Sequence, residues 1–251
     1  MERAGRRLGE RPRAQHDPAY EVVLDLVHAG PAVEILEVGC GSGTALRLAA
    51  DRGANVTALD AAPAFVEHAL RRVPGADVRV GDLQFLPYED ESFDVVMGFN
   101  AFQYAADPMA ALAEARRVLR PGGLVSALVW GPAEECELAP HLQAVGALMP
   151  PAPAGAPGPF SCSAPGALRA LLEERGFEVT VVGDAAAAFS YPDEPTALRG
   201  LTSAGPVIKA VVHAGEEAVQ TAVAEAIVPN RRDDGSYRFE NVWRFAIGRK
   251  T

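Results

Sequence analysis

The chain has 251 residues, a net charge of -10 and an apolar content of 49%. This length suits one large α/β domain, with room for an inserted subdomain but not for two full domains. No uninterrupted apolar stretch approaches the roughly 20 residues that a membrane helix needs, and an acidic chain is poorly suited to sequence-independent contact with DNA or RNA. The sequence therefore predicts a soluble protein with no membrane insertion and no nucleic-acid partner.

The N-terminus is rich in arginine rather than in apolar residues, so we expect no secretory signal and a cytoplasmic location. Residues 1–16 are interpreted as a flexible arm, which is either a solvated tail or a segment that closes over a ligand. The main domain is expected over 17–251. The three cysteines, Cys40, Cys136 and Cys162, show no paired spacing, which predicts neither a disulfide framework nor a metal site.

Hydrophobic patterns in the first half of the chain predict strands that alternate with helices. Because right-handed crossovers are needed to return each strand to the same sheet, this alternation predicts a parallel, doubly wound α/β sheet. Strands are expected over 33–38, 56–60, 77–80, 94–98 and 124–130, and helices over 17–29, 44–51, 63–72 and 109–119.

The second half of the chain is less regular. A Pro/Gly-rich run over 149–160 is interpreted as a linker or mobile loop. Gly205-Pro206 interrupts a helical region, which predicts two or three short helices there. The expected elements are a helix around 134–148, a helix from Ser163 to Arg175, a strand over 177–182, the helical region 194–227 and a strand over 237–247.

A glycine-rich turn links the first strand to the helix over 44–51. Glycine lets a ligand approach the backbone closely, and the helix start offers unpaired N–H groups and a partial positive charge, so the turn predicts a nucleotide-type site. A dinucleotide fingerprint places its third glycine three positions after the second. Here Gly39, Gly41 and Gly43 are each two apart, with Glu37 two positions before the first, which argues against a pyrophosphate cradle.

Five motifs stand out along the chain: Glu37–Gly43, Leu59–Asp60, Gly81–Leu83 with Leu86–Pro87, Ser92–Val96 and Arg117–Gly123. Together they resemble the class I S-adenosylmethionine (SAM) dependent methyltransferases, of the type named methyltransferase domain 11 or UbiE-like. The resemblance implies a Rossmann-like sheet of seven strands, with order 3-2-1-4-5-7-6 and an antiparallel last strand. It also implies a helical cap over 131–165 and 186–237 that covers the active site.

The same resemblance implies SAM as the cofactor. Glu37 and the glycine turn would meet its methionine portion, Asp60 its ribose hydroxyls, and Asp82 its adenine. Asn100 would contact the methionine portion or the acceptor, or would only make a local hydrogen bond in its loop. The complete predicted set is Glu37, Gly39, Cys40, Gly41, Gly43, Asp60, Ala61, Asp82, Leu83 and Asn100.

The sequence names no definite catalytic base. Residues 102–104 stand where many relatives carry a His-containing segment that faces the acceptor, so Gln103 and Tyr104 are candidates. His141 is a further candidate, together with His16 and His213. No metal site is expected.

The sequence thus predicts direct in-line transfer of a methyl group from SAM to a small-molecule acceptor, with alignment rather than a dedicated base as the main contribution of the protein. Two alternatives stay open. One is a SAM-binding regulatory or assembly protein without turnover, and the other is an NAD(P)-dependent oxidoreductase, which the glycine spacing disfavours.

Overall fold

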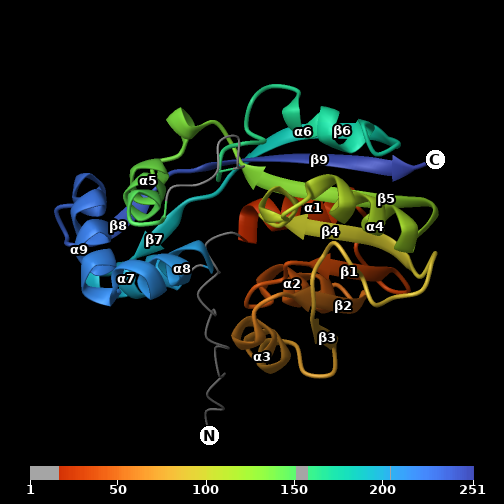
Figure 1. Cartoon of the computed structure of the whole chain (residues 1–251), viewed down its shortest axis with the longest axis horizontal. Helices are drawn as coiled ribbons and strands as arrows, with labels where there is room; N and C mark the ends of the chain where they lie inside the picture. The colour runs from red at the N-terminus through yellow and green to blue at the C-terminus, as the bar shows by residue number, and fades with distance from the viewer. Residues whose placement is uncertain (1–16, 151–157, 204) are drawn as a thin grey trace, which may run out of the picture.

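The structure is a computed structural model that describes residues 17–150, 158–203 and 205–251 (Figure 1). The predicted arm over 1–16 and most of the predicted linker over 149–160 lie outside the described residues. Among the helices of the described ranges, none is both long and apolar enough to cross a membrane.

A seven-stranded sheet forms the centre of the fold, with the order β3-β2-β1-β4-β5-β9-β6. The pairs from β3 to β5 are parallel, whereas β9 runs antiparallel to both β5 and β6. The predicted order is confirmed, with β9 as the seventh strand of the sheet. The strands are β1 (Glu34–Val38), β2 (Asn55–Asp60), β3 (Asp77–Val80), β4 (Phe93–Phe99), β5 (Leu119–Trp130), β6 (Phe177–Ala186) and β9 (Val242–Lys250).

Helices cover both faces of this sheet, because successive strand residues point to opposite sides. Ile35 packs in an apolar cluster with residues of α1 and α2, whereas Leu36 packs in a second cluster with residues of α4 and α6. A third cluster joins α2 and α3 to β2 and β3. These helices are α1 (Asp17–Leu26), α2 (Thr44–Asp51), α3 (Pro63–Arg72), α4 (Pro108–Val118) and α6 (Ala167–Glu173).

Four further helices and a two-stranded antiparallel sheet form a separate group beside the large sheet (Figure 1). We call this group the cap. It meets the large sheet near the carboxyl end of β5, where Trp130 contacts Phe189 of the cap. The cap elements are α5 (Ala139–Ala147), β7 (Phe189–Tyr191), α7 (Glu194–Thr202), α8 (Gly205–Ala214), α9 (Glu216–Ile227) and β8 (Tyr237–Phe239).

The prediction of one continuous strand over 237–247 is wrong. This segment is divided between β8 and β9 at Asn241, which is 2% exposed. The side chain of Asn241 accepts a hydrogen bond from the backbone N–H of Leu138 and donates one to the backbone oxygen of Phe239. These two bonds hold the junction at which the chain passes from β8 of the cap into β9 of the large sheet. The predicted division of 194–227 into two or three helices is confirmed.

Three predicted helices differ from the structure by three residues or more. The helix expected over 17–29 ends at Leu26. The helix expected around 134–148 is a short 3-10 turn (Ala133–Glu135) followed by α5, which starts beside Pro140 because proline fits a first helical turn. The helix expected from Ser163 starts only after Gly166, which has a φ of 80°. The Ser163 hydroxyl instead donates to the backbone oxygen of Phe160.

Two predicted strands are longer than expected. β5 begins at Leu119, so the Pro-Gly-Gly segment 121–123 lies within it, and β6 continues to Ala186 because β9 pairs with it along this length. The strand β7 was not predicted.

Candidate cofactor and acceptor site

The glycine turn lies between β1 and α2 and has a left-handed backbone at each of its three glycines. Gly39, Gly41 and Gly43 have φ values of 66°, 53° and 75°. The backbone N–H groups of Gly39 and Cys40 both donate to the backbone oxygen of Leu59, at 2.8 and 3.1 Å. The turn is thereby tied to the end of β2.

The three glycines differ in what surrounds them. A Cβ atom added at Gly39 would lie 2.7 Å from the Cβ of Ala101, and one added at Gly43 would lie 3.0 Å from Ala69. At Gly41 an added Cβ would meet no atom of the described chain within 4 Å. Packing therefore requires two of the glycines, whereas Gly41 faces open space in which a ligand can contact the backbone.

Glu37 is buried beneath this turn, with 3% of its surface exposed. Its Oε2 atom has no hydrogen-bond partner among the described residues. Burial raises the pKa of the carboxyl group to about 8; a backbone hydrogen bond from Leu46 opposes this shift, and the negative charge of Asp60 adds to it. A cationic group at this position would supply the missing partner and would favour the ionised carboxylate.

Asp60 ends β2 and is also buried, at 9% exposed. Its Oδ2 accepts from the N–H of Gly41 at 2.8 Å, and its Oδ1 accepts from the N–H of Ala62 at 2.9 Å. The intervening residue, Ala61, is exposed. Each carboxylate oxygen has a second lone pair, so Asp60 can hold the turn and still accept from a ligand. The sequence did not predict its bond to Gly41.

Asp82 follows β3 and is exposed, whereas Leu83 is half-buried against the second apolar cluster. The preceding residue, Gly81, donates its N–H to the backbone oxygen of Asp60 at 3.0 Å. The two predicted ligand carboxylates therefore follow neighbouring parallel strands at one edge of the sheet. This is the edge at which open α/β sheets bind ligands.

Asn100 follows β4 with a φ of 52°, a left-handed conformation that asparagine tolerates better than most residues. Its N–H donates to the backbone oxygen of Leu128, and its Oδ1 accepts from Nε2 of Gln103 at 2.7 Å. The local hydrogen bond that the sequence left open is therefore present. Gln103 is 1% exposed, and its Oε1 has no partner in the part of the chain that the structure describes.

The other candidate catalytic groups lie on separate elements. Tyr104 is 40% exposed in the short 3-10 turn Phe102–Tyr104, and partial burial raises its pKa. His141 lies on α5 in the cap, where burial lowers its pKa to about 4, and its Nδ1 has no partner within 17–150, 158–203 and 205–251. His213 is exposed on α8, and His16 lies outside the described residues.

Aromatic rings that the sequence did not single out meet near the end of β5. Trp130 stacks on Trp243, with ring centroids 4.1 Å apart. Phe160 and Phe189 lie 6.3 and 6.2 Å from Trp130. The junction between the large sheet and the cap is therefore lined by an aromatic, apolar group. No local sequence pattern predicts this aromatic group, because its four residues come from four separate segments.

Residues 36–127 match the family model described as Methyltransferase domain. The predicted resemblance to class I methyltransferases is confirmed. The chain is 36% identical over 105 residues to a malonyl-[acyl-carrier protein] O-methyltransferase of Serratia marcescens, with 42% of this chain and 41% of that protein covered. It is 39% identical over 102 residues to a demethylmenaquinone methyltransferase of Renibacterium salmoninarum, with 41% and 43% covered.

A third relative is an uncharacterized 37.1 kDa protein of a transposon in Streptomyces fradiae, 44% identical over 108 residues, with 41% of this chain and 31% of that protein covered. The chain thus spans less than half the length of these relatives. Among solved structures, the fold is similar to a geranyl diphosphate methyltransferase (TM-score 0.55, 19% identity, 94% and 79% of the two chains). It is also similar to the [4+2]-cyclase SpnF (TM-score 0.57, 23% identity, 94% and 85%).

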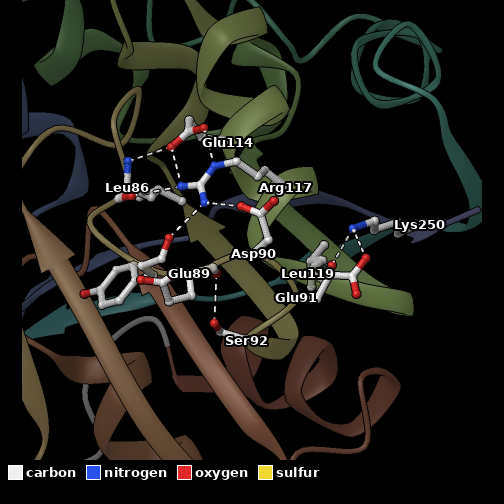
Figure 2. Close-up of polar contacts among 10 residues, drawn as sticks. Leu86, Glu89, Asp90, Glu91, Ser92, Glu114, Arg117, Leu119 and Lys250 are labelled. Atoms are coloured by element: carbon white, nitrogen blue, oxygen red, sulfur yellow. Dashed lines mark hydrogen bonds and ion pairs between the residues drawn. The ribbon is translucent and has the colours of Figure 1, made fainter.

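Within the region that matches the family model, one arginine fastens the loop that leads from Asp82 to β4 (Figure 2). The guanidinium of Arg117 donates twice to Glu114, once each to the backbone oxygens of Leu86 and Tyr88, and once to Asp90, at 2.7 to 2.9 Å. All five N–H donors of the side chain are thereby used. The sequence analysis identified the motif Arg117–Gly123, but it did not predict these contacts of Arg117.

Proposed function

We propose that the chain is an enzyme that transfers a methyl group from SAM to a small-molecule acceptor. The observation that carries the proposal is the open glycine turn with its two buried carboxylates, Glu37 and Asp60. It lies within the residues that match the methyltransferase family model.

Four features of the site fit the cofactor. The unpartnered Oε2 of Glu37 suits the ammonium group of the methionine portion, and the open side of Gly41 leaves room for the rest of that portion against the backbone. The remaining lone pairs of Asp60 suit the ribose hydroxyls. Asp82 suits the adenine amino group, and the N–H of Leu83 suits the ring. When bound, SAM supplies a methyl group on a sulfonium, which is already activated for transfer.

The protein then has to align the acceptor and exclude water. Correct placement of two reactants can contribute roughly 7 to 11 kcal/mol to lowering a barrier. Phe160, which is partly exposed beside Trp130, would contact an apolar part of the acceptor, and the exposed Tyr104 would hydrogen-bond a polar part. The cap segments 131–165 and 186–237 would cover the site, and no dedicated base is required.

The test begins with calorimetric titration of the full chain with SAM, with S-adenosylhomocysteine and with NADP. Binding of NADP without binding of SAM would overturn the proposal in favour of an oxidoreductase. Turnover is then measured with methyl-labelled SAM and a panel of small phenols, alcohols, amines and carboxylic acids. Formation of labelled product supports the proposed methyltransferase activity. Tight SAM binding with no labelled product across the panel favours a non-catalytic SAM-binding protein.

A further inference from the structure

Gln84 lies between Asp82 and the start of helix α4. Its backbone N–H donates to Oδ1 of Asp82 at 2.9 Å. Its side-chain Nε2 donates to both carboxylate oxygens of Asp82, at 3.0 and 3.2 Å. Its Oε1 accepts from the backbone N–H of Asp107 at 2.7 Å. One side chain thus joins Asp82 to the helix.

These contacts fix which way round the Gln84 amide lies. A backbone N–H can only donate, so the atom that faces Asp107 must be the amide oxygen. An ionised carboxylate can only accept, so the group that faces Asp82 must be the amide NH₂. Both partners therefore require the same orientation. A glutamate at this position would keep the contact to Asp107 but would place a second carboxylate against Asp82.

Helix α4 is a fixed support for this contact. Asp107 caps the helix, because its side chain accepts from the N–H groups of Met109 and Ala110. The same helix also holds the backbone of Leu86, which lies two residues after Gln84 (Figure 2). Glu114 accepts from the Leu86 N–H at 2.9 Å, and Arg117 donates to the backbone oxygen of Leu86 at 2.9 Å. The segment from Gln84 to Leu86 is therefore attached at both positions to α4 or its capping residue.

We infer that Gln84 is a positioning residue that sets the direction of the Asp82 carboxylate and thereby determines how selectively the site binds adenine. The inference rests on the proposed function, in which Asp82 accepts from the adenine amino group. The amide NH₂ contacts both oxygens of Asp82 from one side. Because the carboxylate is held there, its remaining lone pairs stay directed away from the amide, toward the exposed side.

Selectivity is tested with two ligands that differ only at the base. S-adenosylhomocysteine carries the amino group, whereas its 6-deamino analogue, with purine in place of adenine, carries only a hydrogen atom there and offers the carboxylate no N–H donor. We expect the unmodified protein to prefer the adenine ligand by about 10- to 100-fold in Kd, since a hydrogen bond to a charged group is at stake. Gln84→Glu should lower this ratio about tenfold, and Gln84→Met should lower it by a smaller factor.

Gln220→Glu is a matched control. Gln220 also donates its amide NH₂ to a carboxylate, that of Glu216, but it does so on α9 in the cap. This change should leave the ratio of the two affinities unaltered. Asp60→Ala should weaken both ligands equally, because the ribose is the same in each.

The outcomes separate the two proposals. If the unmodified protein binds neither ligand, the proposed function fails. If it prefers the adenine ligand and both Gln84 variants keep that preference while remaining folded by circular dichroism, the proposed function stands and the role of Gln84 is overturned. If Gln84→Glu does not fold, Gln84→Met decides by the same ratio.

Discussion

Replacing Glu37 by glutamine should make the ligand-free protein more stable at alkaline pH. The folded-state pKa of Glu37 is raised to about 8 from the ordinary value of 4.5, mainly by burial. Between these two pH values the folded protein keeps a proton that the unfolded chain has released. The stability that depends on this proton is fully present below pH 4.5 and is lost as the pH rises through 8.

The size of the effect follows from the shift. A change of about 3.5 pKa units corresponds to about 5 kcal/mol, at 1.36 kcal/mol for each unit. Relaxation and entry of water reduce such penalties in real proteins, so we expect about 1 to 3 kcal/mol. Glutamine is neutral at every pH, and it has nearly the shape of the protonated glutamate. The variant should therefore match the unmodified protein near pH 5 and exceed it above pH 8.

The assay is chemical denaturation of both proteins at several pH values from 5 to 9. Glu34→Gln is the control, because Glu34 lies on the same strand but its carboxylate is near the surface, 2.6 Å from Nδ2 of Asn55. Parallel stability curves for Glu37→Gln and the unmodified protein would refute the reasoning. Despite its greater stability, the Glu37 variant should bind SAM more weakly, since it cannot offer a negative charge to the ammonium group.

Three further predictions concern the turn and the cap. Asp60→Ala should weaken SAM binding by about 1 to 3 kcal/mol, measured by calorimetry, because a charged acceptor is lost; unchanged affinity would contradict the ribose assignment. Gly41→Ala should fold with a loss of about 1 kcal/mol but bind SAM poorly, whereas Gly39→Ala should lose more stability in thermal unfolding because of its clash with Ala101. His141→Ala should reduce the single-turnover rate by less than the roughly thousandfold that a positioned base can contribute, once an acceptor is known, and a greater loss with intact SAM binding would identify a general base.

Glycine and proline residues at the ends of elements explain why the first half of the fold was predictable. The helices Thr44–Asp51 and Pro63–Arg72 have the predicted bounds, because glycine or proline marks where each begins. The strand order followed from the family resemblance, and the parallel sheet followed from the alternation of strands and helices. These features depend on short segments, so the sequence carries them directly.

The interactions that hold the site in place could not be predicted in this way. The carboxylate of Asp60 meets Gly41, which is 19 positions away, and the amide of Gln84 meets Asp107, which is 23 positions away. Neither residue type nor spacing indicates such a pair. The same is true of the stack between Trp130 and Trp243, which depends on the pairing of β5 with β9. Tertiary structure determines all three contacts.

The two buried carboxyl groups beside the turn, those of Asp60 and Glu37, differ in their hydrogen-bond partners. Asp60 already receives two backbone N–H groups, one of them from the turn itself, so it contributes to the shape of the free site. Oε2 of Glu37 has no hydrogen-bond partner among the described residues, so it can accept from a ligand. Cys40 belongs to the same turn, and burial raises the pKa of its thiol, to which the nearby carboxyl groups of Glu37 and Asp60 add, so the thiol favours its protonated form. Because Asp60 fixes the geometry of the turn and Oε2 of Glu37 is unpaired within the described part of the chain, a cationic ligand can displace the proton of Glu37 and form a charge pair without reorganising the turn.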